Sequence, residues 1–205
     1  MPKDKAETYQ RIIPCAKREF LEKGFEKASM RAIAADAGMT AAGLYRHFVD
    51  KEAMFVELVG PAANGLKELF LVAHEEFNKL PKEIKEETVF DYSIDKLEKF
   101  IDYIYDHLDQ FKLLVTCAEG TAFADFMDSL VAIEVKYTLK FIESTGNDGL
   151  TSGRITPEFM HIVSSAFFSA VFEVVKHDMT KETAKSYIES LRIFFTAGWK
   201  KVLSP

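Results

Sequence analysis

Apolar side chains recur every three or four positions along most of this chain, a spacing typical of amphipathic helices. The spacing predicts helices over residues 4–23, 30–37, 40–48, 50–77, 89–108, 110–118, 121–144, 158–178 and 181–202. No segment alternates apolar and polar residues convincingly, so no strands are expected. The pattern therefore predicts an all-α fold of about nine helices.

Prolines and glycines interrupt this pattern at a few places. Pro14 removes the amide that would bond to Gln10, so the first helix is expected either to bend there or to begin its stable part near Ile13. Gly60 and Pro61 are expected to kink the helix over 50–77 without ending it. Residues 78–88 and 145–157 are charged or rich in turn residues and are predicted to be loops.

The stretch from Ser29 to Lys51 contains two short helical patterns that meet at Gly38. Glycine readily adopts the left-handed backbone that ends a helix, and Thr40 can cap the helix that follows. The apolar residues expected to face the core are Met30, Ile33, Ala34, Ala37, Leu44 and Phe48. A helix, a tight turn and a second helix form the pattern of a helix-turn-helix motif.

The second helix of such a motif has the right size and chemistry to enter the major groove of DNA. Residues 40–48 would span about 13 Å at the helical rise, enough to cross the groove once. Arg31 and Arg46 are the best candidates for guanine contacts, because arginine can bind guanine with two hydrogen bonds. The predicted DNA-binding set is Ser29, Arg31, Thr40, Ala41, Ala42, Gly43, Tyr45, Arg46, His47 and Lys51.

The distribution of charge supports this prediction. The whole chain has a net charge of −6, which by itself argues against nucleic acid. Residues 1–51, however, hold 10 Lys and Arg against 7 Asp and Glu, whereas residues 52–205 hold 16 against 25. A basic N-terminal quarter joined to an acidic remainder indicates that only one end meets phosphate.

Composition argues against several other classes of protein. The 205 residues are 48% hydrophobic and include no signal sequence or 18-residue apolar run, so a cytoplasmic protein that contacts no membrane is expected. Cys15 and Cys117 are far apart, and the five histidines are scattered, so no metal or other cofactor is expected. The sequence shows no paired carboxylates, no nucleophile with its base and no phosphate-binding glycine loop, which argues against an enzyme.

Several short motifs in residues 8–59 occur in the order found in one protein family. They are Gly24-Phe25, Ala28-Ser29, Ile33-Ala34, Ala37-Gly38-Met39-Thr40, Gly43-Leu44-Tyr45-Arg46-His47-Phe48 and Lys51-Glu52. This segment resembles the N-terminal domain of the TetR family of transcriptional regulators. The resemblance implies phosphate contacts from Thr40, Tyr45, His47 and Lys51, and base contacts from Arg31, Arg46 and positions 41–43. Ala42 departs from the glycine or proline usual there.

The resemblance also implies how the chain is organised. A three-helix DNA-binding domain is expected at residues 1–50, followed by a larger helical domain at 51–205 that binds a ligand and forms the dimer. The two last helices are apolar on more than one face and so need a partner surface. The predicted dimer interface is Phe167, Val171, Val174, Val175, Leu191, Phe194, Phe195 and Trp199. A central position in a large monomer is the alternative.

An aromatic interior between Phe70 and Phe172, with few polar residues, suits an amphipathic ligand, although aromatic stripes at helical spacing are more often plain core packing. Glu119 is the most notable residue, because a carboxylate among apolar residues needs exposure or a partner. The predicted ligand-binding set is His74, Phe77, Tyr103, Cys117, Glu119, Phe123, Met127 and Phe168.

Together these patterns predict a regulator, most often a repressor, that binds double-stranded palindromic DNA as a homodimer. A small apolar or amphipathic effector is expected to release it by moving the helix over 50–77. The alternative is a helical module that binds a small molecule or a partner without sequence-specific DNA binding.

Overall fold

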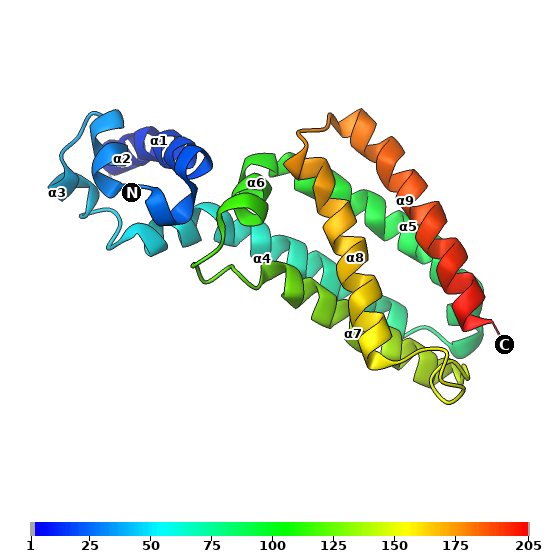
Figure 1. The fold of residues 1–205 in the computed structure, drawn as a ribbon. Coiled ribbons are helices and arrows are strands. Elements are labelled where there is room, and N and C mark those ends of the chain that lie inside the picture. Colours follow the sequence, from blue (N-terminus) through cyan, green and yellow to red (C-terminus); the bar gives the residue numbers. More distant parts are fainter. Residues whose placement is uncertain (1–2, 205) are drawn as a thin grey trace. The chain divides into compact units, whose positions relative to one another are not determined.

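The computed structural model describes residues 3–204, apart from the side chains of residues 3–6 and 94. Nine helices and no strand occur in this part of the chain, as the periodicity predicts (Figure 1). They form two compact units: one contains the chain up to Asn64 together with His107–Asp125, and the other contains Gly65–Asp106 and the chain from Phe126 onward.

The first unit contains the predicted helix-turn-helix. Its helices are α1 (Lys3–Lys27), α2 (Met30–Asp36), α3 (Ala41–Leu44), the first part of α4 (Lys51–Asn78), and α6 (Leu108–Cys117). Phe20 and Phe55 meet edge to face in its core, with ring centroids 5.3 Å apart. The residues predicted to be buried in the motif are buried: Met30, Ile33, Ala34, Ala37, Leu44 and Phe48.

Helix α6 belongs to this unit because it packs along α1. Lys17 of α1 forms an ion pair with Asp109 of α6 at 3.2 Å. At the other end of α6, the buried Cys117 thiol donates to the carbonyl oxygen of Phe20 at 3.2 Å. Cys117 is therefore a structural residue of this unit, and the predicted domain boundary at residue 50 differs from the division that the structure has.

The second unit is a bundle of long helices. It contains the rest of α4, α5 (Lys82–Asp106), α7 (Phe126–Thr145), α8 (Pro157–Lys176) and α9 (Lys181–Leu203). Helix α8 packs against both α7 and α9, and α5 also packs against these two (Figure 1). Pro157 stands at the start of α8, where a helix tolerates proline, and Thr156 caps it.

Two prolines lie inside helices. Helix α1 continues through Pro14 and departs from helical geometry at Gly24, whose φ is 72°. Helix α4 runs from Lys51 to Asn78 with Pro61 inside it, so this proline does not end the helix, as predicted. The predicted loop over 78–88 is wrong, because α5 already begins at Lys82: Pro81 precedes that helix, and its carbonyl accepts from the Lys85 amide.

Among the described helices, α8 is the one long and apolar enough to cross a membrane by length and composition. A core helix passes the same test, and seven residues of α8 are buried within the protein: Met160, Ser164, Phe168, Val171, Phe172, Val174 and Val175.

Candidate DNA-binding surface and ligand cavity

Short-range hydrogen bonds fix the geometry of the helix-turn-helix. Ser29 caps α2, since its hydroxyl accepts from the Ala32 amide at 3.4 Å, while its own amide donates to the Glu19 carboxylate at 3.0 Å. Gly38 adopts the left-handed backbone with a φ of 66°, as predicted. The Met39 amide then bonds back to the carbonyl of Ala34 at 2.9 Å, which closes the turn.

Helix α3 is shorter than predicted. The α-helix covers Ala41–Leu44, and the chain continues through tighter turns in which the Arg46 amide bonds to the Gly43 carbonyl at 3.2 Å. The Thr40 hydroxyl accepts from the Gly43 amide at 3.1 Å and so caps α3, which leaves its proton free to donate to a phosphate. A Cβ on Gly43 would lie 3.2 Å from Met39 Cε, so the small residue also fits the packing of the turn.

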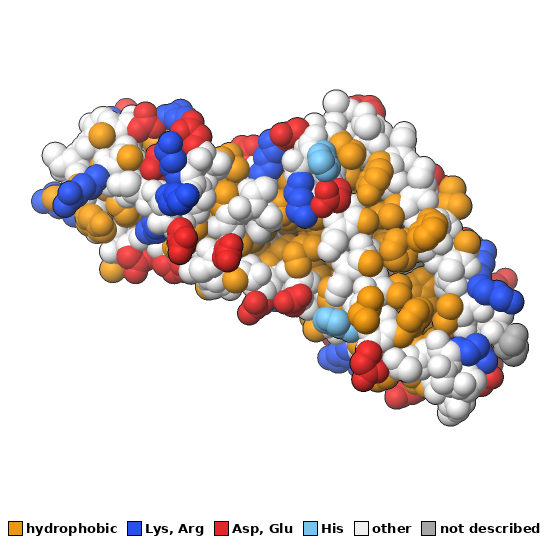
Figure 2. Space-filling view, in the orientation of Figure 1, with side chains coloured by type: hydrophobic (Ala, Val, Ile, Leu, Met, Phe, Trp, Pro, Cys, Tyr) orange, Lys and Arg blue, Asp and Glu red, His pale blue; other side chains and the backbone are white. Residues whose placement is uncertain are grey.

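Three of the predicted DNA-binding side chains are exposed and unengaged. Arg31 and Arg46 are exposed, and Tyr45 is 50% exposed. Within the described residues, none of the three forms a side-chain hydrogen bond or ion pair, whereas Arg18 is paired with Asp36. Figure 2 shows Lys and Arg side chains at the end of this unit that carries α3. These groups are available to a polyanion.

Lys51 is engaged inside the protein. Its ammonium donates to the carbonyl oxygens of Glu26 at 2.9 Å and Ala28 at 3.3 Å. It also lies 4.5 Å from the centre of the Phe25 ring. Lys51 thus connects the start of α4 to the end of α1. The sequence predicted a phosphate contact for this residue and did not indicate this structural role.

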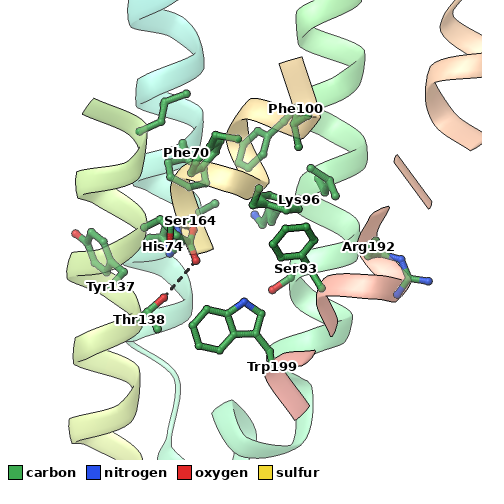
Figure 3. A pocket seen from close by; sticks show the side chains of 18 of the residues that line it. Phe70, His74, Ser93, Lys96, Phe100, Tyr137, Thr138, Ser164, Arg192 and Trp199 are labelled. Carbon is green, nitrogen blue, oxygen red and sulfur yellow. Dashed lines mark hydrogen bonds and ion pairs between the residues drawn. The ribbon is translucent and has the colours of Figure 1, made fainter. Parts of the chain in front are cut away.

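A cavity of about 240 Å³ lies entirely within the second unit (Figure 3). Its walls come from α4, α5, α7, α8 and α9. Most of the lining side chains are apolar, and the aromatic ones are Phe70, Phe77, Phe90, Tyr92, Phe100, Tyr137, Phe141, Phe167, Phe168, Phe172, Phe195 and Trp199. A concave, aromatic site with few polar groups is the usual form of a small-molecule site.

One polar cluster stands on the α4 and α7 side of this cavity. His74 Nε2 lies 3.2 Å from Glu134 Oε2, and the Thr138 hydroxyl donates to Glu134 Oε1 at 3.2 Å. The His74 ring stacks on Tyr137 with centroids 5.1 Å apart. Burial opposes ionisation of Glu134, but the hydrogen bonds from His74 and Thr138 and the His74 charge outweigh it and hold the carboxyl pKa below its usual value.

Two cations line the cavity elsewhere, and each has its own carboxylate. Lys96 forms an ion pair with Glu76 at 3.0 Å, and Arg192 pairs with Glu189 one helical turn away. In both pairs the carboxylate is more than half exposed and is not among the described lining residues. Burial lowers the pKa of Lys96, but the hydrogen bonds to Glu76 and Tyr92 reverse this and raise it overall.

The predicted ligand-binding residues do not converge on one place. His74, Phe77 and Phe168 line the cavity. Tyr103 and Met127 do not, although they belong to the same unit; a Cβ on Gly65 would overlap the Tyr103 hydroxyl, so Tyr103 packs against α4.

The other three predicted ligand-binding residues belong to the first unit and do not line this cavity. Cys117 is buried against α1, and Phe123 lies beside Gly60. Glu119 is exposed, which is one of the two arrangements expected for a carboxylate among apolar residues.

The sequence reasoning missed Glu134, although a signal was present. Leu130, Glu134, Tyr137 and Phe141 follow the helical spacing, so Glu134 occupies a position of the apolar stripe.

The predicted dimer-interface residues also separate into groups. Val171, Val174 and Val175 are buried within the unit, so they offer no surface to a second copy. Phe167, Phe195 and Trp199 line the cavity, and Leu191 is half-buried. Phe194 of α9 is 73% exposed, and Ile162 of α8 and Ile193 of α9 are exposed as well. Figure 2 shows hydrophobic side chains over α8 and α9.

Comparison with known proteins agrees with this geometry. Residues 12–58 match the model for bacterial regulatory proteins of the TetR family. The chain is 33% identical over 84 residues to the HTH-type transcriptional repressor BepR of Brucella suis, a match that covers 41% of this chain and 40% of BepR. It is 32% identical over 120 residues to the HTH-type transcriptional regulator SAB2452 of Staphylococcus aureus, covering 58% of each. The chain thus matches about half the length of these curated relatives.

The whole fold has solved counterparts. A TetR-like transcriptional regulator from Rhodococcus sp. RHA1 superposes with a TM-score of 0.61 at 21% identity, covering 97% of this chain and 99% of that one. The fold and the exposed motif define an all-helical protein of the helix-turn-helix class. Over residues 12–58 the chain is thus similar to bacterial regulatory proteins of the TetR family.

Proposed function

We propose that the protein is a transcriptional repressor that binds a palindromic DNA operator as a homodimer and is released by a small apolar or amphipathic ligand. The observation that carries the DNA-binding part is the capped α2–turn–α3 motif with exposed, unengaged Arg31, Tyr45 and Arg46. The small residues Ala41, Ala42 and Gly43 let the backbone of α3 approach the bases closely. Specificity then rests on the two arginines and on the shape of the DNA.

The surface of α8 and α9 supports the proposed dimer. Ile162, Ile193 and Phe194 are 65%, 57% and 73% exposed, and such large apolar side chains on neighbouring helices favour burial against a partner. A two-fold dimer presents two copies of α3 about 34–36 Å apart, one turn of DNA, which makes the preferred operator a palindrome.

Release by a ligand requires that the cavity and the DNA-binding motif share a conformational equilibrium. The chain passes between the two units inside α4, at residues 64–65, and again before α6 and before α7. A ligand that binds the cavity more tightly in one arrangement of these helices shifts the population toward it. The protein acts on DNA in the cytoplasm in this proposal. It represses transcription, as the name of its relative BepR states for that protein.

Selection of bound fragments from a pool of random duplexes tests this function. The expected product is a palindrome with half-sites one helical turn apart, and an effector found by screening should lower the affinity for that operator at least tenfold. Recovery of no enriched sequence, with full folding of the protein, would favour a helical small-molecule or partner-binding module instead. An effector that saturates the cavity without changing operator affinity would contradict the release step.

A further inference from the structure

The charged groups that line the cavity differ in how they are neutralised. Lys96 and Arg192 are each held by a carboxylate that faces largely outward. Glu134 is the one carboxylate among the described residues that line the cavity. Its ionic partner is His74, a side chain that carries positive charge only when protonated. With His74 neutral, the cavity wall holds a negative charge without a permanent counter-charge.

Glu134 has capacity for a further partner. An ionised carboxylate offers about four acceptor positions, and His74 and Thr138 occupy one on each oxygen. Against the effect of burial, the hydrogen bonds that His74 and Thr138 donate favour the ionised form of this carboxyl. Its side chain is 31% exposed, and the residue lines the cavity, so a bound molecule can reach it.

Aromatic rings contact His74, the ionic partner of this carboxylate. Phe70 meets the His74 ring edge-on with centroids 4.5 Å apart, and Tyr137 stacks on the same ring with centroids 5.1 Å apart (Figure 3). Trp199 lines the cavity across from His74 and Thr138, whereas the Arg192 guanidinium points away from them (Figure 3). Aromatic faces attract cations, and they strengthen an ion pair by excluding water from it.

We propose that the cavity binds a lipophilic organic cation, an ammonium or similar charge on an apolar body, with the charge at Glu134 and the body among the aromatic rings. This inference rests on the proposed function insofar as the cavity is the effector site. The rival ligand is an amphipathic anion whose head meets Lys96 and Arg192, and the experiment separates the two.

Three probes with the same ten-carbon chain make the test: decyltrimethylammonium, decanol and decanoate, titrated calorimetrically below their micelle concentrations. Trp199, the single tryptophan, lines the cavity and gives a second signal through its fluorescence. The cation is expected to bind at least tenfold more tightly than the alcohol, and the anion most weakly. Equal affinities for cation and alcohol, or tightest binding of decanoate, would overturn the proposal.

Two variants locate the charge that is responsible. Glu134→Gln keeps the shape of the side chain and should weaken binding of the cation by about 10- to 100-fold, while binding of decanol changes less than about threefold. Glu143→Gln is the matched control, because Glu143 is exposed on the same helix and its loss changes the net charge equally. An equal loss of cation affinity in both variants would show that the acidic surface attracts the cation, and would contradict the proposal.

These measurements contain no DNA, so they fail independently of the proposed function. If a cation binds at Glu134 but operator affinity is unchanged, ligand-controlled release is contradicted and the proposed class of ligand is still supported. If neutral or anionic compounds release the operator and the cation does not bind, the proposed class of ligand is contradicted and the proposed regulatory function is still supported.

Discussion

At the scale of single residues, Lys51 shows how one side chain serves the fold of the DNA-binding unit. Its ammonium replaces the missing hydrogen bonds at the end of α1 by bonding to the carbonyls of Glu26 and Ala28. It also covers the ring of Phe25, which packs on Phe20 and Phe55 in the core. A lysine read from sequence as a phosphate ligand is thus held by the protein itself.

Replacing Lys51 by alanine is expected to lower the free energy of unfolding by about 1–2 kcal/mol, because two carbonyls lose a charged donor. Urea denaturation measures this, with Lys23→Ala, at an exposed position of α1, as the control. An unchanged midpoint for Lys51→Ala, together with a large loss of DNA affinity, would restore the phosphate-contact assignment.

Tyr9 gives a prediction about pH. Burial raises the pKa of Tyr9 to about 12 from an ordinary 10.0, and both the hydrogen bond to Glu57 and the negative charge of Glu57 contribute to the increase. The folded protein therefore holds the phenol proton more tightly than the unfolded chain does. The resulting stability is present below pH 10 and is lost as the pH rises toward 12.

Tyr9→Phe should accordingly make the fall in unfolding free energy between pH 10 and 12 shallower, and denaturant midpoints measured across that range report it. The other tyrosines are unaltered in this variant and supply the common background. The same slope in both proteins would mean that Tyr9 titrates normally in the folded state.

At the scale of elements, the local features of the fold were predictable and the long-range ones were not. Gly38 and Thr40 act through neighbours within five positions, so their roles follow from residue type and spacing. The loop predicted at 78–88 failed because its charged residues are good helix formers and Pro81 precedes the helix.

Pairings between distant positions carry no periodic signal. The hydrogen bond from Cys117 to Phe20 joins residues 97 positions apart, and it assigns α6 to the DNA-binding unit. The His74–Glu134 pair likewise joins α4 to α7. The helix-turn-helix residues could therefore be predicted from the sequence, whereas the set of residues that lines the cavity could not.

The cap of α3 gives a prediction at this scale. Thr40→Ala removes the acceptor for the Gly43 amide and should cost about 1 kcal/mol of stability. DNA affinity should fall further than stability does, because α3 is only one turn long and depends on its cap. Thr40→Ser retains the hydroxyl and should recover both quantities, as measured by thermal unfolding and by titration with duplex DNA. Recovery in neither would exclude capping as the role of Thr40.

At the scale of the whole molecule, the exposed apolar residues of α8 and α9 predict self-association. Phe194→Glu places a charge at the most exposed of these positions and should shift the protein toward monomer at micromolar concentration. Sedimentation velocity measures this. Ile84→Glu, at an exposed apolar position of α5, is the control and should leave the assembly intact. Equal behaviour of the two variants would show that another surface forms the dimer.

The central claim, binding of DNA through the helix-turn-helix, is tested most directly by the salt dependence of affinity for duplex DNA. The wild-type protein is expected to lose affinity steeply as salt rises, because phosphate contacts release counterions. The double variant Arg31→Ala/Arg46→Ala should bind at least about tenfold more weakly. Lys99→Ala/Lys201→Ala, which removes the same charge from exposed positions of the other unit, should bind like the wild type. Salt-insensitive binding, or equal affinities of the two double variants, would contradict the account.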